Sequence, residues 1–204
     1  MGGRFCAAEG RLTFMPAPAA LELVRPSAEH LPGYIAALQR GWSADNLRGA
    51  AAAADELEQI AADAAGFLAH MVDREARGGP VTLPDGSQVP RLPSLRCWLW
   101  DGEFCGSIGL RWPADKGAMP PHVLGHIGYA VVAWKQRRGY ATRALALLLP
   151  KARAEGLAQV EITTDPTNIA SQRVITANGG VLVERFNRPA AYGGTPGLRY
   201  RIAL

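Results

Sequence analysis

The sequence contains few cysteines, and their spacing excludes two common kinds of stabilised fold. Cys6, Cys97 and Cys105 are the only three, an odd number without the paired spacing of a zinc site or of a disulfide framework. A two-residue hairpin turn at Asp101-Gly102 would place Cys97 and Cys105 on opposite faces of a sheet, too far apart to bond. We therefore expect free thiols, no metal, and a reducing cytoplasmic setting.

Long apolar runs are also missing. No run reaches the roughly 18–20 residues that a membrane-spanning helix needs. The N-terminal stretch MGGRFCAAEGRLTFMPAPAA has no continuous apolar segment of the kind that marks a secretory signal. We expect residues 1–18 to form a flexible extension and residues 19–204 to form one domain without a membrane partner.

A strong excess of one charge is absent as well. The chain has 22 Lys and Arg against 18 Asp and Glu, a formal net charge of +4. This excess is too weak to indicate nucleic-acid binding by itself, although it suits an anionic small molecule. With 204 residues, of which 48% are hydrophobic, the chain is large enough to bury the core of a single globular domain.

Hydrophobic periodicity predicts an α/β domain with a mixed sheet. The Asp101-Gly102 turn makes Leu95–Trp112 a β-hairpin, which is antiparallel. A strand–helix–strand unit follows it, and such units are parallel. The other expected strands are Leu21–Arg25, Leu124–Val132, Gln159–Thr164, Val181–Phe186 and Leu198–Leu204. The expected helices are Ser27–Arg40, Ala50–Arg77 with a break near Gly66, Ala141–Glu155 and Ile169–Ala177.

A basic segment with one glycine, WKQRRGYATRAL, joins a predicted strand to a predicted helix. The first N–H groups of a helix have no intrahelical partner and carry partial positive charge. Gly139 lets the backbone approach a ligand closely, and the preceding turn adds further N–H donors. Neither the P-loop pattern nor the Rossmann glycine pattern occurs. The segment is therefore interpreted as another kind of pyrophosphate site, supported by Arg137, Arg138 and Arg143.

The same residues resemble a known family. Gln136, Gly139 and Ala141 fill the fixed positions of the pattern [QR]-x-x-G-x-[GA], which is similar to the acetyl-CoA signature of the GNAT N-acetyltransferase superfamily. Asn168 and Gly179 stand where the family has an Asn that starts a helix and a Gly that ends it. The IGYAVV…RRGYAT segment looks most like the subgroup that includes ribosomal-protein N-terminal acetyltransferases.

The resemblance implies a fold and a co-substrate. The implied fold is α/β, a single-domain GNAT fold with a mixed, mostly antiparallel twisted sheet flanked by helices and a V-shaped splay between the two central parallel strands. The implied co-substrate is acetyl-CoA. Its pyrophosphate would bind the backbone of Gln136, Arg137, Arg138, Gly139, Tyr140, Ala141 and Thr142, its pantetheine arm the strand end Ala130, Val131 and Val132, and Asn168, Ser171 and Arg173 would lie beside it.

The resemblance also implies direct transfer of the acetyl group from the thioester to an amine. Such an enzyme mainly positions its two reactants, and a base must remove a proton from the amine. Strand alternation puts His126 on one face with Gly128 and Ala130, which leave space beside it. Histidine titrates near neutral pH, so His126 is the first candidate base. Glu161, in the next strand, is the second.

At the position of the acid that protonates the leaving thiolate, this chain departs from the family pattern. The family's usual acid is a Tyr in the last helix, and alignment on Asn168 and Gly179 puts Ile175 at that position. Ile175 cannot donate a proton. Either Tyr129 serves as the acid or the thiolate leaves unaided, and a backbone N–H near Val132 is a candidate to stabilise the oxyanion.

The predicted function is therefore acetyl-CoA-dependent N-acetylation of a primary amine, on a small molecule or on a peptide or protein N-terminus. A non-catalytic acyl-CoA-binding module on the same fold is the alternative, because of Ile175. A nucleic-acid binder would need a broad basic face, whereas the positive charge here forms one local cluster. Acetyl-CoA and an amine-bearing acceptor are the expected partners, nucleic acid is not, and a homodimer is left open.

Overall fold

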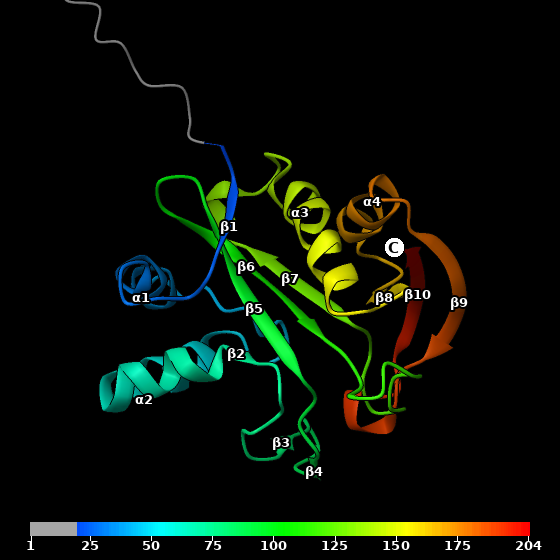
Figure 1. The fold of residues 1–204 in the computed structure, drawn as a ribbon, viewed down its shortest axis with the longest axis horizontal. Helices are drawn as coiled ribbons and strands as arrows, with labels where there is room; N and C mark the ends of the chain where they lie inside the picture. Colours follow the sequence, from blue (N-terminus) through cyan, green and yellow to red (C-terminus); the bar gives the residue numbers. More distant parts are fainter. Residues whose placement is uncertain (1–19) are drawn as a thin grey trace, which may run out of the picture.

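The computed structural model describes residues 20–204 (Figure 1). The expected N-terminal extension, residues 1–18, lies outside the described residues. The described part folds into strands and helices that alternate broadly as the sequence predicts, with helices on both faces of the sheets.

Two sheets form the centre of the molecule. In the first, β1 (Glu22–Val24), β5 (Ser94–Trp100), β6 (Phe104–Arg111) and β7 (Ile127–Val131) lie in that order, and β2 (Val72–Asp73) also pairs with β5. In the second, the order is β8 (Gln159–Thr164), β10 (Pro196–Ala203) and β9 (Val181–Asn187). A small hairpin of β3 (Val81–Thr82) and β4 (Gln88–Val89) stands apart from both. All the paired strands are antiparallel.

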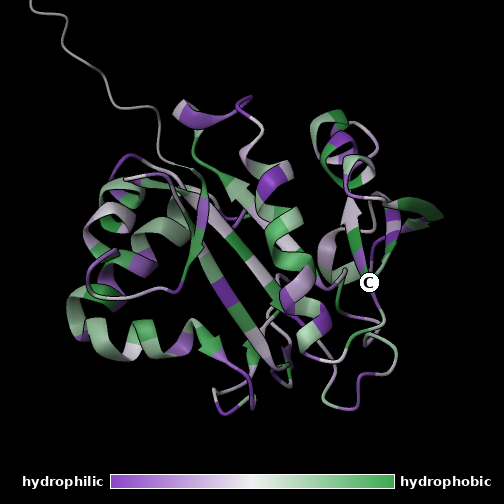
Figure 2. Cartoon of the chain, turned by 45° about the horizontal axis from the view of Figure 1, so that its top comes forward, coloured by the Kyte–Doolittle hydropathy of each residue, from purple (hydrophilic) through white to green (hydrophobic). Residues whose placement is uncertain are grey.

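Four helices divide the apolar residues into two cores. The helices α1 (Leu31–Gln39) and α2 (Ala50–His70) cover one face of the first sheet, where Tyr34 stacks on Trp98 with ring centroids 4.6 Å apart. The helices α3 (Tyr140–Ala154) and α4 (Ile169–Ala177) pack against the other face and against the second sheet. Because strand side chains alternate between faces, Trp98 of β5 lies in the first core while its neighbours Cys97 and Leu99 lie in the second. The central strands therefore carry apolar residues on both faces (Figure 2). The three-residue helices η1 (Ala133–Lys135) and η2 (Ala190–Tyr192) connect larger elements.

The strands β7 and β8 meet at one end and separate at the other. The N–H of His126 donates to the carbonyl of Glu161 at 2.7 Å, just before β7 begins. Within residues 20–204, no ladder of paired residues continues this contact along the two strands. A Cβ at Gly125 would lie 2.8 Å from the Glu161 carbonyl oxygen, so only glycine permits this approach. The expected α/β fold, with mostly antiparallel strands flanked by helices and a splay between β7 and β8, is confirmed. The expected parallel pairing is absent from the described residues, because β7 and β8 do not form a continuous ladder.

Two details of the predicted elements are wrong. The hairpin does pair β5 with β6, but Cys97 lies opposite Ile108 instead of residue 106, because the connection is longer than two residues and a bulge follows Leu99. Cys97 and Cys105 are both buried in the α3-side core as free thiols, so the prediction that they point to opposite faces of the sheet is wrong. The long helix ends at His70 instead of Arg77, and its break falls at Asp63, whose carboxylate accepts the N–H of Gly66 at 2.9 Å.

Gly125→Ala is expected to lower the free energy of unfolding by about 1–3 kcal/mol, because a methyl group must force β7 away from β8 at their point of contact. The measurement is urea-induced unfolding. Gly109→Ala is the matched control, because its Cβ would meet nothing closer than a carbonyl at 3.7 Å. Since alanine orders the unfolded chain, the control should be neutral or slightly more stable than wild type. Equal stability of the two variants would contradict this account of the splay.

Candidate functional site

The loop between β7 and α3 has the backbone shape of an anion-binding turn. Arg137 and Gly139 both adopt positive φ, at 61° and 77°, and Gly139 is the residue that caps α3. No side chain of the described residues caps this helix start, so its first N–H groups face outward. A Cβ at Gly139 would find no atom within 4 Å. The turn therefore presents free N–H donors to an open space, which suits a phosphate group.

A buried ionic cluster holds this loop against the β5–β6 hairpin. The ammonium of Lys135, whose side chain is 5% exposed, donates to Asp101 at 2.6 Å and to Glu103 at 2.7 Å. Its Nζ also lies 3.4 Å from the Cys105 sulfur, and the Tyr140 hydroxyl donates to Asp101. Thus residues on both sides of the turn, Lys135 before it and Tyr140 after it, are fixed to the same carboxylate.

The titration of this cluster follows from burial and pairing. Burial raises the pKa of the Asp101 carboxyl, but the hydrogen bonds from Lys135 and Tyr140 outweigh it and bring the pKa down to about 2. Burial lowers the pKa of Lys135, but its bonds to the two carboxylates raise it above its ordinary value. Burial and the Asp101 charge raise the pKa of Cys105 to about 12, so this thiol stays protonated. The cluster is a fixed ion pair at neutral pH.

A long groove of about 1970 Å³ runs from this loop through the opening between β7 and β8. It continues onto the face that α1 and α2 cover, so it joins both sides of the sheet. Most of the predicted cofactor residues line it, namely Ala130, Val131, Gln136, Arg137, Gly139, Tyr140, Ala141, Thr142, Asn168, Ser171 and Arg173.

Two predicted cofactor residues do not line the groove. Val132 is fully buried beneath α1 and α2, and its N–H donates to the Cys105 carbonyl at 3.0 Å. That N–H is therefore bonded within the sheet and does not face the groove. Arg138 is exposed and lies outside the lining.

The end of β7 directs polar backbone groups into the opening toward β8. Because the Val132 N–H bonds to β6 and bonding direction alternates along a strand, the backbone of Tyr129 and Val131 faces the other way. Gln136 confirms this direction, since its Nε2 donates to the Val131 carbonyl at 3.3 Å. This strand edge is able to hydrogen-bond an extended ligand as another strand would.

Tyr129 and the start of α4 meet across the groove. The Tyr129 hydroxyl lies 2.9 Å from the Ser171 Oγ. Burial raises the pKa of Tyr129 to about 12, so the phenol is protonated at neutral pH. The Asn168 carbonyl oxygen accepts the N–H of Ser171 at 2.9 Å, so this side chain caps α4. Ile175, by contrast, is fully buried in the core.

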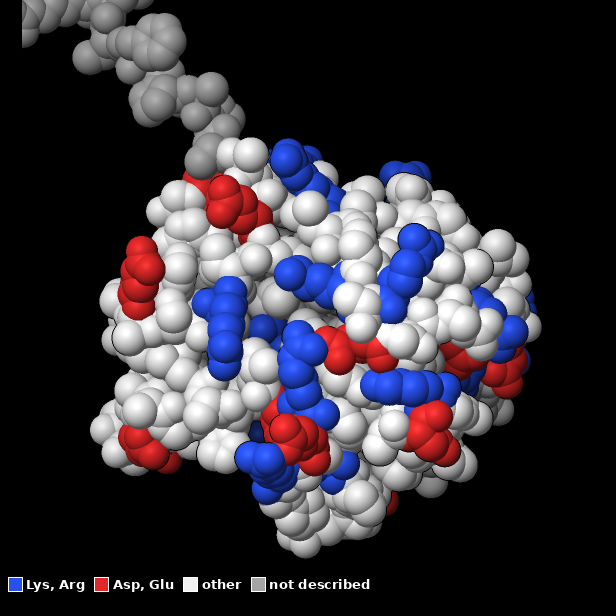
Figure 3. Space-filling model, in the orientation of Figure 1, with Lys and Arg blue, Asp and Glu red and all other residues white. Residues whose placement is uncertain are grey.

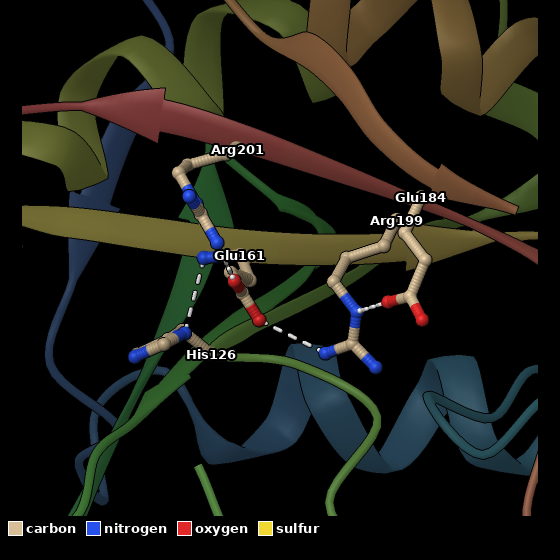
Figure 4. A network of polar contacts seen from close by, with 5 residues as sticks. All are labelled: His126, Glu161, Glu184, Arg199 and Arg201. Atoms are coloured by element: carbon tan, nitrogen blue, oxygen red, sulfur yellow. Dashed lines mark hydrogen bonds and ion pairs between the residues drawn. The ribbon is translucent and has the colours of Figure 1, made fainter. Parts of the chain in front are cut away.

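The structure does not bring His126 and Glu161 into this groove. They line a separate cavity of about 740 Å³ on the outer side of the β7–β8 contact (Figure 4). The Nδ1 of His126 accepts the N–H of Glu161 at 3.0 Å, and burial lowers the pKa of this histidine. Glu161 accepts hydrogen bonds from Arg199 at 2.9 Å and Arg201 at 2.8 Å. Burial raises the pKa of Glu161, but these two arginines bring it below its ordinary value.

The part of the groove beneath α1 and α2 contains charged residues that the sequence did not single out. Glu56 of α2 accepts the hydroxyl of Tyr34, and Arg96 of β5 lies 4.0 Å from the same carboxylate. Arg111, at the end of β6, also lines the groove, and its side chain is exposed. Only the pairing of β5 with β6 and their coverage by α2 bring these residues together, and no local motif marks them.

The charges on the visible face are mixed. Lys and Arg side chains lie among Asp and Glu side chains across the face in Figure 3, without forming one continuous basic surface.

Among the residues that the structure describes, no three His, Cys, Asp or Glu side chains group as metal ligands would. In the same part of the chain, no helix has both the length and the apolar character of a membrane span.

Comparisons with known proteins point to one family. The model of the acetyltransferase (GNAT) domain matches residues 21–181. No curated protein matches the chain in sequence.

Solved structures share the fold at low sequence identity. RimL, a ribosomal L7/L12 α-N-protein acetyltransferase in complex with coenzyme A, is 14% identical, with 93% of this chain and 97% of RimL covered and a TM-score of 0.58. An acetyltransferase from Salmonella typhimurium that modifies the N-terminal serine of L7/L12 is 16% identical, with 90% and 95% covered and a TM-score of 0.58. The microcin C7 self-immunity acetyltransferase MccE, in complex with acetyl-CoA and AMP, is 13% identical, with 90% and 92% covered and a TM-score of 0.54. The predicted family is confirmed, and the predicted subgroup is represented among these structures.

Asp101→Asn is expected to lower the free energy of unfolding by about 3 kcal/mol, because it removes the buried charge that balances the Lys135 ammonium. Urea-induced unfolding at pH 7 measures the change. Glu103→Gln is the matched control: its side chain is 70% exposed, so its loss should cost less than about 1 kcal/mol.

The same pair predicts an acid dependence. The pKa of Asp101 is lower in the folded chain than in the unfolded chain, so its stabilising contribution is present above about pH 4 and is lost as the pH falls toward 2. The stability difference between wild type and Asp101→Asn should shrink over that range. A difference that is the same at pH 7 and pH 3 would contradict the assignment.

Proposed function

The chain belongs to the GNAT acetyltransferase domain family and is an acyltransferase, and we propose that it transfers an acetyl group directly from acetyl-CoA to a primary amine. The acceptor amine belongs to a small molecule or to a peptide or protein N-terminus. The observation that carries the proposal is the continuous groove, which begins at the anion-binding turn before α3 and passes between β7 and β8 to the opposite face of the sheet.

The groove offers coenzyme A a matching sequence of contacts. The N–H groups around Gly139 would bind the pyrophosphate, with Arg137 and Arg173 nearby on the lining. The outward-facing backbone of Val131 would bond the pantetheine arm, and Gln136 would release the Val131 carbonyl that its amide now occupies. The thioester would then lie beside Ala130 in the opening between the strands.

Tyr129 is proposed as the acid that protonates the departing thiolate. It lines the groove next to the expected sulfur position, and its pKa of about 12 keeps a proton available at neutral pH. Ser171 orients the phenol through their 2.9 Å hydrogen bond. This assignment replaces the family's usual donor in the last helix, where Ile175 is buried in the core.

Glu56 is proposed as the group that accepts the amine proton. Of the four carboxylates on the groove, Asp55 is paired with Arg48 and Asp165 with Arg188. Asp45 accepts the backbone N–H groups of Leu47 and Arg48. Glu56, by contrast, lies 4.0 Å from its nearest cation. The proposal gives His126 and Glu161 a positioning role at the closed end of the V, because they face the other cavity. The His126 Nδ1 already accepts the N–H of Glu161, and both carboxylate oxygens of Glu161 accept hydrogen bonds from arginines.

Gly139→Glu is expected to abolish acetyl-CoA binding, because a carboxylate would project into the site of the pyrophosphate. Isothermal titration with acetyl-CoA measures it. Gly156→Glu is the matched control, because Gly156 has a similar φ of 83°, equally open surroundings and a place just beyond the C-terminal end of α3, away from the groove. The control should bind acetyl-CoA as wild type does. Normal binding by Gly139→Glu would contradict the proposed phosphate site.

Tyr129→Phe is expected to lower kcat by about 10²-fold while leaving the affinity for acetyl-CoA nearly unchanged, because the phenyl ring keeps the packing and loses only the proton donor. Release of the free thiol during acetylation of a panel of amines measures turnover. A wild-type protein that binds acetyl-CoA and acetylates no amine would favour the non-catalytic acyl-CoA-binding module.

A further inference from the structure

The groove contains two arginines, on the sheet face that α1 and α2 cover, that have only one carboxylate between them. We propose that Arg96 and Arg111 bind a carboxylate carried by the amine acceptor, close to the amine that is acetylated. This inference rests on the proposed acetyl transfer and specifies the class of its acceptor. It follows from the position of the arginines in the sheet, their ion pairing and the space between them.

The sheet register places both arginines on the same face. Arg96 lies opposite Gly109 on β6, and Gly109 lies opposite Gly128 on β7. Arg111 lies two residues beyond Gly109 on β6, so it projects from the same face as Arg96, on a diagonal of roughly 7–8 Å between Cα atoms. The two glycines leave the strip of sheet between the arginines without side chains.

That strip opens directly toward the reaction position. A Cβ at Gly128 would lie 3.7 Å from a terminal nitrogen of Arg111, so the guanidinium stands beside the bare β7 backbone. Ala130, where the thioester is proposed to lie, is the next residue along the same face, about 7 Å away. The residues Gly109, Arg111, Gly128 and Ala130 all line the groove.

The positive charge of the arginines is only partly balanced. Glu56 is 4.0 Å from Arg96, beyond hydrogen-bonding distance, and it already accepts the Tyr34 hydroxyl. Within residues 20–204, no carboxylate lies within 4.0 Å of Arg111. Two guanidinium groups on one face repel each other, and a bound carboxylate would relieve that repulsion. The planar donors of arginine suit carboxylates because they form two parallel hydrogen bonds.

The spacing limits the acceptor to compounds in which amine and carboxylate are a few bonds apart. An acceptor nitrogen near Ala130 and a carboxylate beside Gly128 are separated by about 7 Å at most, because the arginines reach into the strip between them. A free amino acid meets this condition through its α-carboxylate. A peptide meets it when its N-terminal residue is Asp or Glu.

The test compares acceptors that differ only in the carboxylate. Wild-type protein is assayed for thiol release with the tripeptide amides Asp-Ala-Ala and Asn-Ala-Ala, and with glycine and glycinamide. We expect kcat/KM to be about 10- to 100-fold higher for the carboxylate member of at least one pair, as befits a charged hydrogen bond. The pair that shows the preference identifies the source of the carboxylate. Equal or higher kcat/KM for both uncharged members would overturn the inference while leaving the proposed acetyl transfer intact.

The Arg111→Gln variant tests whether Arg111 causes the preference for acceptors with a carboxylate. The ratio of kcat/KM between the preferred acid and its uncharged partner should fall about 10- to 100-fold, and Arg111→Lys should restore part of it. Arg48→Gln is the control, because Arg48 lines the same groove but is already paired with Asp55. Its ratio should match wild type. A ratio that Arg111→Gln leaves unchanged would overturn the inference, as would an equal fall in Arg48→Gln.

A binding measurement keeps the inference separate from catalysis. In the presence of saturating coenzyme A, the acetylated products N-acetyl-Asp-Ala-Ala amide and N-acetylglycine are titrated against their uncharged counterparts. Tighter binding of at least one charged product to wild type than to Arg111→Gln supports the inference even if no tested amine is acetylated, an outcome that would contradict only the proposed function. Binding that does not depend on charge in either pair overturns it.

Discussion

Within residues 20–204, one backbone hydrogen bond links the β7 segment to β8, and it determines the shape of the groove. The backbone bond from His126 to Glu161 joins the strands just before β7 begins. Beyond it, the edge of each strand lacks the partner that it would have in a continuous sheet. Unpaired strand edges normally invite another strand, because backbone N–H and C=O groups need hydrogen bonds. A ligand with amide groups meets the same need, which is why the proposed function places the pantetheine arm at this interruption of the sheet.

The closed end of the V is correspondingly well fastened. Glu161 is held by two arginines of β10, and one of them, Arg199, also bonds Glu184 of β9 at 2.8 Å. The charges therefore tie β8 to the rest of its own sheet, while the His126 ring accepts the N–H of Glu161 from the side of β7. A titratable residue in such a network is more useful as a fixed support than as a proton carrier, because moving its proton would break bonds that hold two strands.

The turn before α3 could be predicted from the sequence, whereas the charged residues on the α1/α2 side of the groove could not. The turn before α3 depends on local features, a glycine with positive φ and an uncapped helix start, and such features are visible in a short segment. Glu56, Arg96 and Arg111 come from a helix and two strands, and only tertiary packing brings them together. The role expected of His126 depended on strand alternation. Alternation assigns a side chain to a sheet face, but it does not show that the backbone N–H of Glu161 already donates to the Nδ1 atom of His126.

The two positive regions of the groove differ in their physical origin, and this difference bears on specificity. Around Gly139 the charge is partial and comes from backbone N–H groups whose positions the fold fixes, so the proposed phosphate site depends on the turn and not on particular side chains. Beside Gly128 the charge is full and comes from side chains, which substitution can change without altering the backbone. An arrangement that binds the cofactor with the main chain and the acceptor with side chains lets the acceptor change while the fold and the cofactor site stay the same.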